Sequence, residues 1–157
     1  MRIFDFKGGE RLQTKLDEIL KKTTGQHEVK VGFLSGSTYP DGTPVAEVAA
    51  IHNFGAPAAN IPARPFFSNM VAEEKPKWGA AIARLLKENG YDAGKALALM
   101  GEDIGGALQQ SIVDTNSPDL ADATIERKGF DKPLIDTGHM RNSVGYQVDN
   151  GEKVIGE

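Results

Sequence analysis

Cysteine is absent from the 157 residues, so the chain can form neither a disulfide framework nor a thiolate metal site. Long apolar runs are missing as well, because none approaches the roughly 18–20 residues that a membrane-spanning helix needs. The N-terminal stretch "MRIFDFKGGERLQ" lacks the apolar segment of a secretory signal. We therefore expect no membrane segment and synthesis in the cytoplasm.

Basic charge is also scarce. The 18 lysine and arginine residues are outnumbered by 22 aspartate and glutamate residues, which gives a net charge of −4 at neutral pH. Proteins that bind nucleic acid usually gather basic side chains on one face. Here the densest basic groups are only Lys21–Lys22 and the "ERK" of 126–128. The charge balance argues against nucleic acid as the main partner and against sequence-specific DNA binding.

Signatures of catalysis are missing too. The three histidines, His27, His52 and His139, have none of the spacings typical of metal ligands. The sequence has no Gly-x-Ser-x-Gly elbow and no phosphate-binding glycine loop. The adjacent carboxylates at 73–74 and 102–103 project about 100° apart on a helix, so neither pair converges on one substrate atom. We expect a protein that is not an enzyme and that uses no cofactor and no metal.

Helix and strand patterns are clear. Helices are predicted over 10–22, 45–54, 65–75, 78–89 and 92–115, where apolar residues recur at helical spacing. Pro76 separates two of them, since proline suits the first turn of a new helix. Alternation in "EVKVGFL" (28–34) and "SVGYQV" (143–148) predicts half-buried strands, and Asn150-Gly151 is a strong hairpin signal.

These elements fit one domain over 1–157 with an α+β fold, in which a small, mostly antiparallel sheet packs against several helices. Residues 116–142 form a polar stretch without helix or strand periodicity. Loops of this length in a compact domain are usually functional or disordered. We therefore expect an interaction loop that is mobile in the free protein and ordered in an assembly.

Small residues form a stripe on the longest helix, at Gly94, Ala98, Gly101 and Gly105. Each interior glycine costs about 1 kcal/mol relative to alanine, so close approach by another backbone would explain the stripe. That backbone belongs either to the same fold or, as the second alternative, to a neighbouring subunit.

The segment 54–67 is stiffened by three prolines, which bias the residues before them toward extended conformations. One interpretation is that Phe66 and Phe67 anchor a loop to the core. The other is that the rigid loop presents Arg64 and its flanks to a partner at low entropic cost. The two interpretations are compatible, with one phenylalanine inward and the loop tip outward.

Two stretches of the chain resemble those of a known protein family. "VAEVAAIHNFGAPAANIPARPFF" followed by "KPLIDTGHMRNSVGYQV" is similar to the neck and tail-completion proteins of tailed bacteriophages, often labelled virion morphogenesis or minor tail proteins. That family has an Ala-rich helix ending in an aromatic-Gly pair, then an Ile-Pro-Ala-Arg-Pro-Phe motif, and later a Leu-Ile-Asp-Thr-Gly motif leading into a strand. The motifs correspond to 46–55, 61–66 and 134–138. Many relatives carry an acidic residue where this chain has Asn53.

The resemblance implies a non-enzymatic assembly protein that forms a homo-oligomeric ring, six- or twelve-fold, at the interface between head and tail. Its partners would be other copies of the chain, the head connector or head-completion protein, and tail-tube or terminator proteins, with genome DNA passing through the ring. It would reside in the neck or tail of the virion. The expected assembly residues are Phe54, Gly55, Ile61, Pro62, Arg64, Pro65, Phe66, Phe67, Leu134, Asp136, Thr137, Gly138, Met140 and Arg141.

Within the second group, Asp136 and Thr137 are expected to fix their loop by side-chain hydrogen bonds to backbone, and Gly138 to permit a positive φ. Three alternatives remain. The ring could be a terminator that caps the tail tube, or the chain could be a small regulatory binding protein of host or prophage. The third alternative is a small hydrolase that uses Asp136, His139 and Ser143.

Overall fold

A computed structural model describes residues 9–25, 27–120, 126, 129, 134, 138–148 and 151–154. Its elements are α1 (Gly9–Thr23), β1 (Val29–Phe33), α2 (Val45–Phe54), the 3-10 helix η1 (Pro57–Ala59), α3 (Phe66–Glu88), α4 (Ala93–Asp114), α6 (His139–Asn142), β2 (Val144–Val148) and β3 (Gly151–Val154). The α+β class is confirmed. Within the described residues, no helix is long and apolar enough to cross a membrane.

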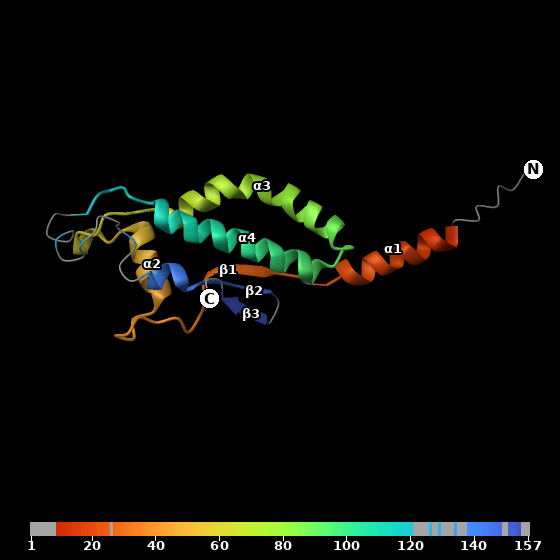
Figure 1. The fold of residues 1–157 in the computed structure, drawn as a ribbon, viewed down its shortest axis with the longest axis horizontal. Coiled ribbons are helices and arrows are strands. Elements are labelled where there is room, and N and C mark those ends of the chain that lie inside the picture. Colours follow the sequence, from red (N-terminus) through yellow and green to blue (C-terminus); the bar gives the residue numbers. More distant parts are fainter. Residues whose placement is uncertain are drawn as a thin grey trace, which may run out of the picture.

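The sheet is antiparallel, in the order β1-β2-β3. Val31 pairs with Tyr146 and Phe33 with Val144, so the alternating apolar residues of both strands share one face. Helix α4 packs on β1 and β2, and α3 packs on α4 on the side away from the sheet (Figure 1). Layers of helix, helix and sheet therefore form the body of the molecule.

Helix α4 shows why the glycine stripe exists. Asp92 caps its first turn by accepting a hydrogen bond from the Lys95 backbone N–H at 2.9 Å. A Cβ added at Gly101 would lie 2.7 Å from two ring carbons of Tyr146 in β2, closer than any real carbon contact. Gly105 is buried as well. At Gly101, close packing within the fold is the correct interpretation, and a subunit contact through that residue is excluded because Tyr146 already fills the space.

The prediction of two helices separated at Pro76 is wrong, because α3 runs continuously from Phe66 to Glu88 with Pro76 inside it. Proline removes one backbone hydrogen bond and crowds the preceding turn, which bends a helix without necessarily ending it. Helix α3 is visibly arched in its middle (Figure 1). Met70 and Leu85, on either side of the proline, are both buried, so packing at both ends holds the helix together.

The main core lies between α2, the start of α3, the C-terminal half of α4 and β2. Its buried members are Val45, Ala49, Phe66, Met70, Leu108, Ile112, Leu134, Met140 and Val144. A smaller cluster, formed by Leu85, Ala96 and Met100, joins the other ends of α3 and α4. The main core is the one that positions the candidate site.

Helix α1 departs from the rest of the fold. Its predicted bounds are confirmed, yet none of its residues is buried. It extends from the body along the long axis of the molecule (Figure 1). Lys22 donates a hydrogen bond from its Nζ to the Gly90 carbonyl at 3.4 Å, which ties the end of α1 to the turn between α3 and α4.

Candidate assembly site

The first group of expected assembly residues (54–67), which we call the first motif, forms a closed loop between α2 and α3. Gly55 ends α2 with φ 76°, and a Cβ there would lie 2.8 Å from the Ala63 backbone nitrogen. Only glycine fits this approach, because a side chain would collide with backbone that cannot move aside. Ala56 and Ile61 exchange backbone hydrogen bonds at 2.9 and 3.1 Å, which closes the loop around η1. The rigid loop predicted from its prolines is therefore also held by its backbone.

Asn53, at the end of α2, binds the N-terminus of α3. Its Oδ1 accepts hydrogen bonds from the backbone N–H groups of Phe67 at 3.0 Å and Ser68 at 3.1 Å, and its Nδ2 donates to the Ser68 hydroxyl at 2.9 Å. The side chain is 4% exposed. Asn53 thus acts as an N-cap supplied by another helix, in place of Pro65, which makes no side-chain cap.

Arg64 does not project toward a partner, so that part of the sequence-based prediction is wrong. The residue is 5% exposed, its Nε donates to the Pro118 carbonyl at 3.0 Å, and its Nη2 donates to the Asp119 carbonyl at 3.3 Å. Burial lowers the pKa of the Arg64 guanidinium below its usual value. Arg64 can be buried because these two carbonyls accept the hydrogen bonds that its planar guanidinium would otherwise donate to water. Its bonds hold the segment after α4 against the first motif.

The three phenylalanines of the first motif have different roles. Phe66 is fully buried and meets the ring of Phe33 edge to face at 6.3 Å between centroids. Phe67 is partly buried against the same core. Phe54 is 75% exposed at the end of α2. The prediction of an aromatic anchor is confirmed for Phe66 and Phe67, whereas Phe54 is presented to solvent.

The remaining residues of this motif differ in how far they are exposed to solvent. Pro62 is exposed, and Ile61 and Pro65 are half-buried. The outer side of the loop therefore consists of proline, alanine and the exposed Phe54, while its inner side is fixed by Arg64 and Phe66. This arrangement is a preorganised apolar surface rather than a charged one.

The described residues of the second group of expected assembly residues (134–141), which we call the second motif, return to the same core. Leu134 and Met140 are buried at 5% and 4% exposure and belong to the cluster that contains Phe66. Gly138 has φ 75° and precedes α6, so the expected positive φ is confirmed. Asp136 and Thr137 lie outside the described residues. The structure therefore brings the two motifs together, although much of the chain separates them.

The C-terminal end of the predicted loop 116–142 is ordered as the helical turn α6, which corrects its assignment as loop. The Ser143 backbone N–H bonds the His139 carbonyl at 3.0 Å, which closes this turn. Most of 121–137 lies outside the described residues, so the predicted mobility stays a prediction.

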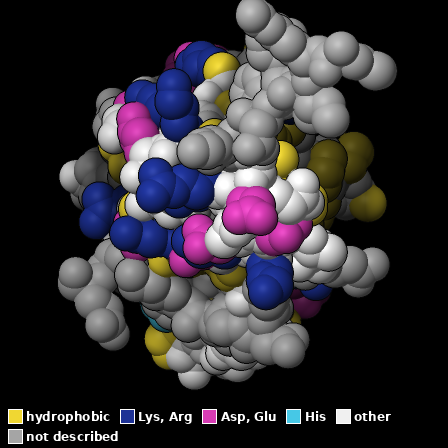
Figure 2. All heavy atoms as spheres, turned by 90° about the vertical axis from the view of Figure 1, so that its right-hand side faces the viewer, with side chains coloured by type: hydrophobic (Ala, Val, Ile, Leu, Met, Phe, Trp, Pro, Cys, Tyr) yellow, Lys and Arg dark blue, Asp and Glu magenta, His cyan; other side chains and the backbone are white. Residues whose placement is uncertain are grey.

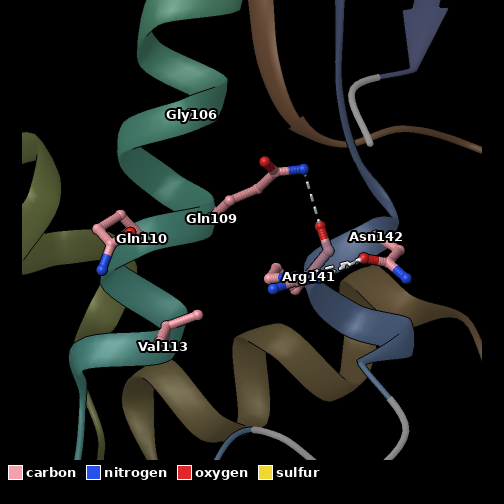
Figure 3. A pocket seen from close by; sticks show the side chains of 6 residues that line it. All are labelled: Gly106, Gln109, Gln110, Val113, Arg141 and Asn142. Carbon is pink, nitrogen blue, oxygen red and sulfur yellow. Dashed lines mark hydrogen bonds between the residues drawn. The ribbon is translucent and has the colours of Figure 1, made fainter. Parts of the chain in front are cut away.

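A hollow of about 180 Å³ separates α6 from α4 (Figure 3). Gln109 donates from Nε2 to the Arg141 carbonyl at 3.3 Å across it, and the Arg141 guanidinium bonds Asn142 Oδ1 at 3.3 Å. The side chain of Arg141 is exposed beside the hollow. Arg141 therefore remains the one accessible cation among the predicted site residues that the structure describes.

The alternative hydrolase site does not assemble from the residues described. His139 donates from Nε2 to the Thr38 carbonyl at 2.8 Å and stacks obliquely on Tyr39 at 4.8 Å. Ser143 donates its hydroxyl proton to the His139 carbonyl at 2.8 Å. The imidazole Nε2 and the Ser143 hydroxyl are thus bonded to two different backbone carbonyls, and Asp136 is outside the described residues. No three histidine, aspartate or glutamate side chains in the described part of the chain are placed to hold a metal ion.

Sequence reasoning missed Asn53 as the residue that connects the two helices. The signal available was a polar residue inside the apolar run of α2, but neither periodicity nor spacing indicates what such a residue contacts. Comparison with known proteins adds no further assignment: no family model, no curated protein and no solved structure matches this chain.

Proposed function

We propose that this chain is a non-enzymatic structural protein of a tailed bacteriophage, one that forms a homo-oligomeric ring at the interface between head and tail. The observation that carries the proposal is the convergence of the two motifs that resemble the neck and tail-completion family. Phe66 of the first motif and Leu134 and Met140 of the second share one buried cluster. Two distant motifs that build one body support a resemblance better than either motif alone.

The surface around this body suits an assembly role. The loop 55–65 is fixed by its prolines, by the Ala56–Ile61 bridge and by the bonds of Arg64. A surface that is already ordered loses little conformational entropy when a partner binds. Phe54, Pro62 and Arg141 supply its exposed apolar and cationic groups, while the buried members of both motifs maintain its shape.

The charge distribution fits protein partners. Viewed from the end that α1 forms, lysine and arginine side chains are interspersed with aspartate and glutamate (Figure 2). Tight binding to DNA phosphates would require a face on which basic side chains predominate. DNA that only passes through a ring does not require one. This face therefore favours contact with other proteins.

Disruption of the gene in the phage or prophage that encodes the chain tests the proposal. We expect DNA-filled heads and separate tails that fail to join, with infectivity restored when wild-type protein is supplied. Joined particles of normal yield would contradict the proposal. A defect confined to tail length, with heads still attached, would indicate the tail-terminator alternative instead.

Phe54→Ala is the matching point variant. Since Phe54 is 75% exposed, its truncation should leave the fold intact while virion yield falls at least about tenfold, as for an aromatic contact residue. Tyr91→Ala, at an exposed aromatic in the turn between α3 and α4, is the control and should leave yield unchanged. Equal yields from both variants would remove Phe54 from the assembly surface.

A further inference from the structure

A groove lies between α3 and α4, where the middle of α3 bends away from its neighbour. Helix α3 is buried near its two ends, at Met70 and Leu85, and none of residues 71–84, all of which the structure describes, is buried. Pro76 lies in this stretch, where α3 arches away from α4 (Figure 1). The groove has a volume of about 80 Å³, and its lining residues are Glu74, Lys77, Trp78, Ala81, Met100, Asp103, Ile104 and Ala107.

The size of the groove suits one side chain. Pockets that enclose a drug-sized ligand measure about 300–1,000 Å³, which is several times larger. A cofactor or a substrate of that size therefore does not fit between α3 and α4, whereas a single side chain of a partner protein does.

The walls of the groove are apolar. Met100 is buried in the smaller core cluster, and Trp78, together with Ala81 and Ile104, packs against that cluster. Ala107 packs against the main core. An aliphatic chain that enters the groove therefore exchanges water for apolar surface, which is favourable. The indole of Trp78 adds a second attraction, because it is the aromatic ring that binds a cation most strongly.

The charged residues of the lining are more exposed than its apolar walls. Lys77 donates a hydrogen bond from Nζ to Glu74 Oε1 at 2.8 Å, so these two charges compensate each other. Asp103 is exposed and has no hydrogen bond or ion pair with the described part of the chain. The groove thus combines apolar walls, one indole ring and one uncompensated carboxylate.

We propose that this groove binds the side chain of a lysine or arginine that a partner protein inserts between α3 and α4. Both side chains join an aliphatic stem to a cationic end. The stem packs against the apolar walls, and the cation lies beside Trp78 and Asp103. An apolar side chain would use the walls alone, and an acidic one would be repelled by Asp103, so charge complementarity selects a basic side chain.

The inference goes beyond the proposed function, because neither the first nor the second motif contributes a residue to the groove. It also does not require the chain to form a ring. An exposed ion pair contributes little by itself, so one isolated side chain should bind with a dissociation constant of about 1 mM. A partner protein would add this contact to others of its own surface.

Trp78 is the single tryptophan of the chain, so its fluorescence reports directly on the groove. The full-length protein is titrated with capped tripeptides whose central residue, between two glycines, is lysine, arginine, norleucine or glutamate. Norleucine has the stem of lysine without its charge. The two basic peptides should change the emission saturably, norleucine should bind at least about fivefold more weakly, and glutamate should give no saturable change.

Variants of the full-length protein separate charge from shape. Asp103→Asn should weaken the lysine peptide about two- to fivefold and leave the norleucine peptide unchanged. Asp114→Asn, an equal charge change on α4 at a residue that does not line the groove, is the control and should bind as wild type does. Ala81→Leu fills the groove and should abolish the response to every peptide, with circular dichroism confirming that the variant is folded.

Three results would overturn the inference. The first is the absence of a saturable response to either basic peptide. The second is equal affinity for lysine and norleucine, or an Asp103→Asn variant that binds lysine as wild type does. The third is an emission of Trp78 that shifts with protein concentration alone, because a second copy of the chain would then cover the groove. All three concern the purified chain, so the head–tail function is decided separately by gene disruption.

Discussion

Asn53 shows how one side chain can connect two elements. Its carbonyl oxygen satisfies two backbone N–H groups at the start of α3, which have no partner inside that helix. Many members of the phage family that the sequence resembles carry an acidic residue at this position, and a carboxylate can accept the same two bonds. An amide and a carboxylate would then serve one structural purpose, with Ser68 donating to the acid instead of accepting from the amide.

Asn53→Ala should therefore lower the free energy of unfolding by about 2 kcal/mol, because a cap is lost and buried donors are left without acceptors. Asn53→Asp should cost less than about 1 kcal/mol, since a negative charge near a helix N-terminus is favourable. Urea denaturation measures both. An alanine variant within about 0.5 kcal/mol of wild type would contradict the capping role.

Two glycines of α4, Gly101 and Gly106, should respond in opposite ways when each is replaced by alanine. Gly101→Ala should lower the free energy of unfolding by about 1–2 kcal/mol, because its methyl group would overlap the Tyr146 ring and the gain in helix propensity does not offset this. At Gly106 a Cβ would meet nothing within 4 Å, so Gly106→Ala should stabilise by up to about 1 kcal/mol. Opposite signs in thermal denaturation are the expected result, and equal signs would argue against the close packing at Gly101.

Arg64→Ala is expected to act on the fold. Loss of its bonds to Pro118 and Asp119 should lower the free energy of unfolding by about 1.5–3 kcal/mol, the range for hydrogen bonds to a charged group. Limited proteolysis should then cut the chain near 116–120 faster than in wild type. A fully stable variant with an unchanged cleavage pattern would restore Arg64 as a surface contact.

At the scale of elements, the sequence predicts more of the fold than of the site. The bounds of α1, α2 and α4 and the strands of the sheet follow from local periodicity and caps, as Asp92 illustrates. Periodicity carries no information on what a side chain meets across the fold. For that reason, the structure was needed to show what Arg64 contacts, that Asn53 caps α3, and that the two motifs share one core.

Helix α3 illustrates how tertiary packing overrides a local rule. Pro76 favours a new helix, yet buried Met70 and Leu85 hold one continuous bent helix on α4. Packing at both ends offsets a penalty of about 3 kcal/mol for an interior proline.

Pro76→Ala should raise the free energy of unfolding by about 1–3 kcal/mol, because Pro76 is exposed and its replacement restores one backbone hydrogen bond without changing the core. Chemical denaturation followed by circular dichroism measures the change. A destabilised variant would mean that the bend itself is needed for α3 to pack on α4.

At the scale of the whole molecule, the chain combines a packed body with an uncovered helix. The body joins both motifs around one core, and α1 extends from it with Leu12, Leu16 and Leu20 exposed. The helical pattern of 10–22 predicts an apolar face, and only the arrangement in space shows that no described part of the same chain covers it.

Electron microscopy of the purified wild-type protein, with native mass spectrometry of the same sample, tests the ring most directly. We predict closed rings of a single symmetry, with a mass that is a whole multiple of the 16.9 kDa chain. Particles that remain monomeric at every concentration, or that join into pairs related by a two-fold axis and grow no further, would contradict the account.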